Sequence, residues 1–219
     1  VACAEEDGYL TFYDYENGTV LASRQITDSD VNCVQFHPDG KRYITGDDDG
    51  NVRLWDHPAH TERYSVPVKK PGVECLVFNG TGDLFALCDR TTEIQIRDTE
   101  TGTVRLNLDG HQGRNTGLAF SPDNSLFASS SRDGTARIWD LDTGATVQVL
   151  EGHISAVWAL RFSPDGTHLA TGGSDLTVRV WNTESWQTER IYRGHQRQVD
   201  ALAYSPDGRI LSSGDDAGT

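Results

Sequence analysis

The sequence predicts an all-β fold built from repeated units of four antiparallel strands. Three sets of residues recur at one interval of 42 positions. The first set is Asp14, Asp56, Asp98, Asp140 and Asn182. The second is a Gly-His pair ending at His111, His153 and His195, and the third is a turn at residues 38–40, 80–82, 122–124, 164–166 and 206–208. A fixed period of this length is typical of folds that repeat one supersecondary unit.

One unit shows its four strands in order. Short runs rich in β-branched and aromatic residues lie at residues 157–162, 169–172, 178–181 and 190–192. Turn residues separate the runs at Pro164-Asp165-Gly166, at Ser174-Asp175 and around Thr183. Four such strands cannot bury both faces of their sheet alone, so we expect neighbouring units to stack face to face.

The recurring Asp divides the chain into six spans. They are residues 1–14 (partial), 15–56, 57–98, 99–140, 141–182 and 183–219 (partial). Counted by strand, the chain starts in the second strand of one unit and stops just after the second strand of another. The sequence contains no Met, so we expect it to be a piece of a longer protein.

The combination of Gly-His, Pro-Asp-Gly, an Asp in a tight turn and Trp-Asp at this period resembles the WD40-repeat family. The resemblance covers essentially the whole chain, and several sets in register are far more specific than one Trp-Asp pair. It implies a β-propeller, a ring of four-stranded antiparallel blades that most often number seven. The chain is then an incomplete arc of about five repeats, and the remaining blades of the same chain complete the ring.

The charge balance argues against nucleic acid as a ligand. The chain has 19 Lys plus Arg against 33 Asp plus Glu, a formal net charge of -14, and no basic stripe. Phosphate binding needs a clustered cationic surface. No apolar run approaches the roughly 20 residues of a membrane-spanning helix, so we expect neither nucleic acid nor membrane as a partner.

A Ser/Thr, His and Asp set recurs in two consecutive units. Its members are His111, Ser129 and Asp133, then His153, Thr171 and Asp175. In a hydrolase such a trio supplies nucleophile, base and orienting acid. The resemblance implies instead a buried tetrad of hydrogen bonds within one blade, ending at Trp139 or Trp181. An enzyme needs one active site and a structural device is needed in every blade, so we expect no catalysis and no cofactor.

The tetrad is not uniform along the chain. The span 57–98 has Lys69, Leu87, Thr91 and Arg97 at the four positions, so we expect the blade around Leu87 to be the loosest. The span ending at Asp56 keeps Thr45, Asp49 and Trp55 but has Thr27 for His, and the last span has Ala217 for Asp.

Potential metal ligands lie only in turns. They are Asp47-Asp48-Asp49, Asp215-Asp216 and the pair His57 and His60, for which a solvated turn is the favoured interpretation. The cysteines are Cys3, Cys33, Cys75 and Cys88, and we expect free thiols because Cys33 and Cys75 occupy a position that takes small residues in other units. Free thiols favour a reducing compartment, so a cytoplasmic location is expected.

The resemblance also implies a rim of the propeller where partners dock. The second residue of the first strand is Asn32, Glu74, Thr116, Trp158 and Asp200, and the residue before the turn Asp is Asp48, Arg90, Arg132, Ser174 and Asp216. Trp158 is the best hot-spot candidate because exposed aromatics are enriched at interfaces, with Arg132 and Arg114 as polar partners. The alternative is that Trp158 plugs the channel or packs on the next blade. Trp186 replaces a turn Gly and is either a second contact or a partly buried turn residue.

Two classes of function follow from these observations. The leading prediction is a non-catalytic scaffold or sensor domain that binds a protein or peptide on the rim. The alternative is the accessory domain of a larger signalling enzyme, such as a kinase or an NTPase, whose catalytic part lies elsewhere. Further sequence beyond Val1 and Thr219 would separate the two.

Overall fold

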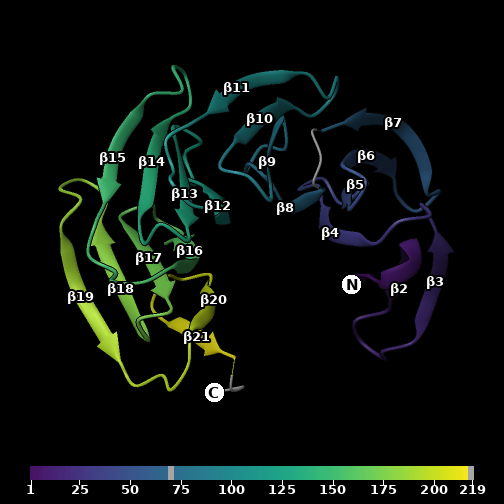
Figure 1. Ribbon diagram of the computed structural model, residues 1–219. Coiled ribbons are helices and arrows are strands. Elements are labelled where there is room, and N and C mark those ends of the chain that lie inside the picture. Colours follow the sequence, from purple (N-terminus) through teal and green to yellow (C-terminus); the bar gives the residue numbers. More distant parts are fainter. Residues whose placement is uncertain (69–71, 217–219) are drawn as a thin grey trace. The chain divides into compact units, whose positions relative to one another are not determined.

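The computed structural model describes residues 1–68 and 72–216, and in them the chain forms strands and a single 3-10 turn, η1 (Glu6–Gly8). Figure 1 shows the strands in chain order. The first sheet has three strands, β1 (Ala2–Ala4), β2 (Tyr9–Tyr13) and β3 (Val20–Gln25). The last has two, β20 (Val199–Tyr204) and β21 (Leu211–Asp215).

Between them lie four-stranded antiparallel sheets in which strands follow chain order. One contains β4 (Val31–Phe36), β5 (Arg42–Asp47), β6 (Asn51–Asp56) and β7 (Thr61–Pro67). The next contains β8 (Val73–Phe78), β9 (Leu84–Asp89), β10 (Ile94–Asp98) and β11 (Val104–Leu108). Then come β12 (Asn115–Phe120), β13 (Leu126–Ser131), β14 (Ala136–Asp140) and β15 (Thr146–Leu150). Last come β16 (Val157–Phe162), β17 (His168–Gly173), β18 (Thr177–Asn182) and β19 (Thr188–Arg193).

The all-β prediction and its strand count are confirmed. The chain begins in a sheet that holds a second, third and fourth strand, and ends in one that holds a first and second strand. The 42-residue spans do not coincide with the sheets. Each span contributes its first strand to one sheet and its next three strands to the following sheet, as β3 and then β4–β6 show for residues 15–56.

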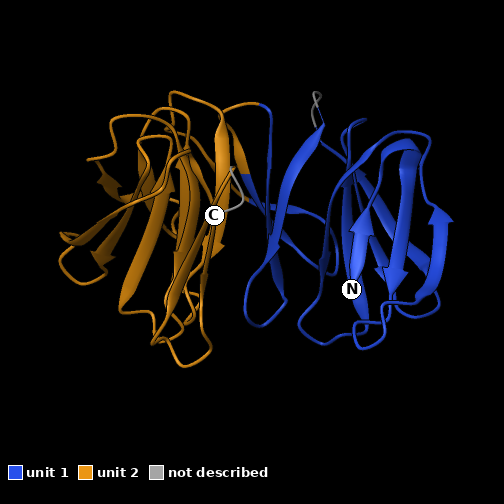
Figure 2. Cartoon of the chain, turned by 90° about the horizontal axis from the view of Figure 1, so that it is seen from below, with its two compact units in different colours: residues 1–90, 95–105 blue, residues 91–94, 106–219 orange. Residues whose placement is uncertain are grey.

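The chain divides into two compact units, which Figure 2 colours separately. Unit 1 comprises Val1–Arg90 and Gln95–Arg105, and unit 2 comprises Thr91–Ile94 and Leu106–Thr219. The division runs through the sheet of β8–β11. Every site described below lies within one unit.

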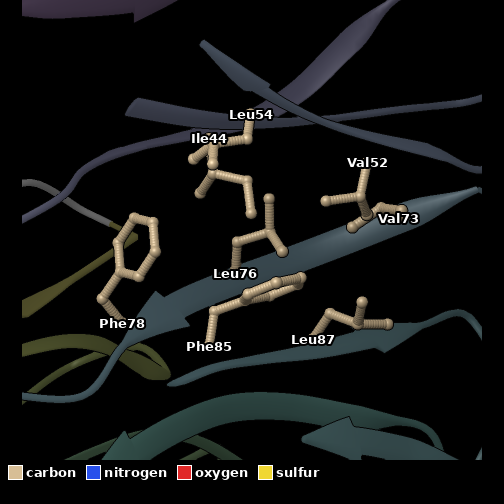
Figure 3. Packing of buried hydrophobic residues seen from close by; sticks show 8 residues of the cluster. All are labelled: Ile44, Val52, Leu54, Val73, Leu76, Phe78, Phe85 and Leu87. Atoms are coloured by element: carbon tan, nitrogen blue, oxygen red, sulfur yellow. The ribbon is translucent and has the colours of Figure 1, made fainter. Parts of the chain in front are cut away.

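The second strand of each complete sheet is buried on both faces. In β5, β9, β13 and β17 every residue after the first is buried, whereas the fourth strands β7, β15 and β19 are largely exposed. This pattern arises because sheets stack: β4 and β5 pack on β8 in unit 1, and β12 and β13 pack on β16 in unit 2. Figure 3 shows the core of unit 1, where Ile44 and Leu54 face Leu76 and Phe85 of the next sheet.

In three sheets, the Asp that sets the 42-residue period closes the turn after the third strand. Asp140 Oδ1 accepts hydrogen bonds from the Thr143 backbone N–H at 2.8 Å and from its hydroxyl at 2.7 Å. Asp14 and Asp98 accept equivalent backbone bonds. Gly144 follows with a φ of +72°. Asp and Gly are favoured here because the carboxylate mimics a backbone acceptor and Gly adopts the left-handed conformation without strain.

Candidate functional site: the rim of the sheets

Every first strand from β4 to β20 carries a β-bulge at its second residue. In β16, Val157 pairs with Gly173 and Ala159 with Gly172, so Trp158 has no opposite residue. The same shift occurs in β4, β8, β12 and β20, at Asn32, Glu74, Thr116 and Asp200. β-Bulges change the direction of a side chain and are frequent at sheet edges and next to active sites. The rim therefore consists of this bulged residue and the residue that follows the second strand.

A repeated backbone bond joins the two sides of the rim. The N–H of Arg132, directly after β13, donates to Arg114 O at 2.9 Å, and Ser174 N–H donates to Ala156 O at 2.8 Å. Asp48 N–H makes the equivalent bond to Asp30 O at 3.0 Å. In these three sheets the loop that enters the first strand is thus fixed to the turn after the second strand, and both lie on one rim.

Trp158 lies half-buried at the rim of unit 2 between two polar neighbours. Its indole N–H donates to Ser174 Oγ at 2.7 Å. The guanidinium carbon of Arg132, from the preceding sheet, lies 4.8 Å from the centre of its ring. A cation over a Trp face at this distance is attracted by the ring quadrupole. The structure thus brings together Trp158 and Arg132, as the sequence predicted, while Arg114 is half-buried and contributes its backbone carbonyl.

The rim continues from Trp158 toward two carboxylates. Ser174 Oγ donates to Gln198 Oε1 at 3.3 Å. Asp200 hydrogen bonds with Gln198 and with Asp216. Desolvation and the bond shared with Asp216 raise the pKa of Asp200 to about 6. The rim of unit 2 is therefore cationic on the Arg132 side of Trp158 and acidic on the other.

The rim candidates of unit 1 largely satisfy one another. Asn32 Nδ2 donates to Asp48 Oδ1 at 2.7 Å and to Val73 O at 3.0 Å. Arg90 Nη2 forms an ion pair with the same Asp48 oxygen at 2.9 Å. Glu74 is half-buried. Three of the predicted candidates therefore form one cluster of hydrogen bonds and an ion pair.

The two predicted tetrads of unit 2 are complete. Trp139 Nε1–H donates to Ser129 Oγ at 2.9 Å, His111 Nε2 lies 2.9 Å from the same oxygen, and His111 Nδ1 lies 2.8 Å from Asp133 Oδ2. The equivalent chain of Trp181, Thr171, His153 and Asp175 has distances of 2.9, 2.8 and 3.0 Å. An indole only donates and a carboxylate only accepts, so each chain fits a neutral imidazole with its proton on Nδ1.

Burial and hydrogen bonding set the charges of the tetrad. Desolvation lowers the pKa of His111 and of His153, although the bonds to Asp133 and Asp175 oppose this effect. Burial raises the pKa of Asp133, but hydrogen bonds from Thr135, the Gln112 N–H and His111 outweigh it and lower that pKa to about 2. Ser129 and Thr171 are fully buried, so neither hydroxyl is accessible to a substrate.

Two tetrads take their carboxylate from a different residue than the period predicts. In the sheet of β4–β7, Asp47 replaces Asp49: it is buried, forms an ion pair with Arg53 and accepts the Asn51 N–H at 2.7 Å, whereas Asp49 is exposed. Thr27 Oγ1, at the His position, lies 3.5 Å from Asp47.

In the last sheet, His195 Nδ1 binds Asp215 at 3.0 Å, and the predicted position, Ala217, lies outside the described residues. Asp215 is the last residue of β21, and its carboxylate also accepts the Gln196 N–H at 3.3 Å. The period assigns this carboxylate to position 217, whereas Asp215 is the residue that binds His195.

The sheet of β8–β11 lacks the tetrad, as predicted. Leu87 is buried in place of Ser/Thr, and Arg97 replaces Trp. Arg97 donates to Gln95 Oε1 at 2.7 Å and to Gly102 O at 2.9 Å, and burial lowers its pKa. Lys69 lies outside the described residues. That this blade is the loosest stays a prediction.

The remaining candidates have structural surroundings. His60 Nδ1 lies 3.1 Å from the Tyr43 hydroxyl, and His57 stacks on Phe12. Trp186 packs against the core of unit 2 at a φ of +55°, which agrees with a partly buried turn residue. All four cysteines are free. Among the described residues, no three His, Cys, Asp or Glu side chains are placed to hold a metal ion, and no helix is long and apolar enough to span a membrane.

The comparison with protein families agrees with this architecture. The model of the WD domain, G-beta repeat, matches residues 18–56, 102–140, 144–182 and 186–219. A search of curated proteins gives no match. Residues 57–101, between the first two matched segments, contain most of the sheet that lacks the tetrad. With more than half of its length matched, the chain belongs to the WD40-repeat family.

Proposed function

We propose that the chain is a non-catalytic interaction module that binds a protein or peptide partner on the rim of unit 2. Trp158 carries this proposal. It is the one large aromatic at the bulged rim position, it is half-buried, and Arg132 and Ser174 hold its ring in place. Fixed Trp and Arg side chains are enriched at interface hot spots because little conformational entropy is lost when they bind.

The tetrads support a structural role rather than catalysis. The Ser/Thr and His pair recurs in three sheets of unit 2, at His111, His153 and His195. In the two complete tetrads its hydroxyl lies in the core. Buried polar chains of this kind stabilise a fold when every member is satisfied.

Charge and cysteine chemistry support the remaining parts of the proposal. A net charge of -14 disfavours nucleic acid as the partner. Four free thiols favour a reducing compartment such as the cytoplasm.

The proposal is tested by affinity capture from cell extract with the intact protein as bait. Wild type, Trp158→Ala and Asn32→Ala are compared, because Asn32 occupies the equivalent bulge in unit 1. We expect Trp158→Ala to lose a partner that wild type and Asn32→Ala both retain. Equal recovery by all three baits contradicts the proposal.

A further inference from the structure

Three large apolar side chains are accessible on the rim of one sheet, that of β16–β19. Ile154, in the loop before β16, is 90% exposed, and Leu176, in the turn between β17 and β18, is 39% exposed. Trp158, which lies between these two residues in the sequence, is half-buried. Large apolar side chains left accessible near one turn of the rim point to a binding surface.

The period shows that these residues are particular to one repeat. The equivalents of Ile154 are Asp28, Lys70, Gln112 and Gln196. The equivalents of Trp158 are Asn32, Glu74, Thr116 and Asp200, and those of Leu176 are Gly50, Thr92 and Gly134. The fold itself therefore needs no large apolar side chain at any of the three positions.

Leu176 occupies an unfavourable backbone conformation. Its φ is +65°, at a turn position where Gly50 and Gly134 have φ values of +80° and +87°. The left-handed region disfavours bulky side chains, and Leu176 is too exposed to gain much from burial. A strained residue that the fold does not require is a sign of function.

Hydrogen bonds hold the three positions around one turn. The Ile154 N–H donates to Asp175 Oδ2 at 3.3 Å, and the Trp158 indole N–H donates to Ser174 Oγ at 2.7 Å. Ser174 and Asp175 directly precede Leu176. The turn between β17 and β18, two strands that Figure 1 shows side by side, is thus bonded to both segments that carry the other apolar residues.

Arg132 adds a cation at the border of this set. The Arg132 side chain is exposed, and one face of its guanidinium lies over Trp158. Within residues 1–68 and 72–216, no carboxylate forms an ion pair with Arg132. Its guanidinium edge can donate two parallel hydrogen bonds to a carboxylate while its face stays on the indole.

We propose that Ile154, Trp158, Leu176 and Arg132 form a docking surface for a partner peptide with a large apolar side chain next to a carboxylate. We call this set the Trp158 surface. The proposal rests on the proposed function and specifies the chemistry of its partner. The apolar side chain covers Ile154 and Leu176, and the carboxylate binds Arg132.

A basic peptide is the competing occupant. Asp200 and Asp216 lie further along the same rim and would attract a Lys or Arg side chain. The Trp158 surface favours the acidic peptide because Arg132 contacts Trp158 directly. The Asp200 and Asp216 carboxylates connect to Trp158 only through the hydrogen bonds of Ser174 and Gln198.

The test is selection of random peptides displayed on phage against the intact chain, followed by affinity measurements on the enriched peptides. We expect enriched peptides to pair Leu, Ile, Phe or Trp with Asp or Glu. Leu176→Gly, Ile154→Gln and Arg132→Glu should each weaken binding by about tenfold or more. Gln112→Ala, at the equivalent of Ile154, is the matched control and should bind as wild type does.

Leu176→Gly separates binding from folding. Glycine relieves the left-handed strain, so its melting temperature should equal or exceed that of wild type while its affinity falls. Enrichment of Lys or Arg peptides, no enrichment at all, or equal binding by every variant overturns the Trp158 surface. Loss of a captured partner in Trp158→Ala with no effect of Leu176→Gly or Arg132→Glu would keep the rim function and reject this surface.

Discussion

Gly82 shows how one residue can link neighbouring sheets at the edge opposite the rim. Its carbonyl oxygen lies 2.9 Å from His37 Nε2, and its φ is +79°. A Cβ atom at Gly82 would lie 2.2 Å from that nitrogen. The Gly at this turn is therefore required by contact with the His37 ring as well as by its backbone conformation.

We predict that Gly82→Ala lowers the free energy of unfolding by about 3 kcal/mol, because it adds a steric clash to backbone strain. The matched control is Gly40→Ala, at the equivalent turn of the preceding repeat. Gly40 has a φ of +68° and open space around its Cβ direction, so it should lose only about 1 kcal/mol. Urea denaturation measures both variants, and equal losses would show that the contact with His37 is unimportant.

At the residue scale, comparison of equivalent positions predicted one contact that the structure shows. Trp158 stands out from Asn32, Glu74, Thr116 and Asp200, and the structure places Arg132 over its ring. The same comparison also distinguishes Ile154 and Leu176, which were not among the predicted rim residues. Their exposure and the positive φ of Leu176 are tertiary facts that a period alone does not reveal.

Within each sheet, the tetrad depends on which carboxylate reaches the buried donors. Sequence register selects Asp49 in the sheet of β4–β7, whereas the structure buries Asp47 beside Arg53. We predict that Asp47→Ala lowers the free energy of unfolding by about 3 kcal/mol, because Arg53 then lacks its buried partner. Asp49→Ala should change it by less than about 0.5 kcal/mol, as for an exposed turn residue. A larger loss of stability in Asp49→Ala than in Asp47→Ala, measured by chemical denaturation, would support Asp49 as the carboxylate of this tetrad.

The tetrad histidines make stability depend on pH. Burial lowers the folded-state pKa of His111 and His153 below their ordinary value. Their stabilising contribution is therefore complete above about pH 6.5 and is lost as pH falls below it. We predict that the melting temperature falls as the pH is lowered from about 7.5 to about 5.5, a range that spans the ordinary pKa of His. The fall should be smaller in His153→Gln. An identical pH profile for that variant would contradict a neutral buried imidazole.

Asp200 changes the pH dependence of stability in the opposite direction to the tetrad histidines. Its folded-state pKa is raised to about 6, so protonation of the folded chain adds stability as pH falls through that value. We predict that Asp200→Asn makes the acid loss of melting temperature steeper. A shallower loss in this variant would show that the Asp200 and Asp216 carboxylates do not share a proton.

At the scale of the whole molecule, the 42-residue period predicted those features whose local chemistry is the same in successive repeats. Turn Asp residues, Gly-His pairs and strand spacing predicted the all-β fold, the partial first and last sheets and the family, because each of these features has the same local function wherever it recurs. The tetrad assignment failed at Asp49, and in the last repeat Asp215 supplies the carboxylate, because side-chain reach is set in three dimensions and two nearby residues can supply one carboxylate.

The central claim is that Trp158 serves binding rather than folding, and one pair of measurements on Trp158→Ala tests it most directly. Unfolding by urea and affinity for the captured partner are measured on the same preparation. We predict that binding weakens by about 2 kcal/mol while the free energy of unfolding changes by less than about 1.5 kcal/mol. A loss of stability of about 3–5 kcal/mol, with no loss of affinity in the folded fraction, would contradict it.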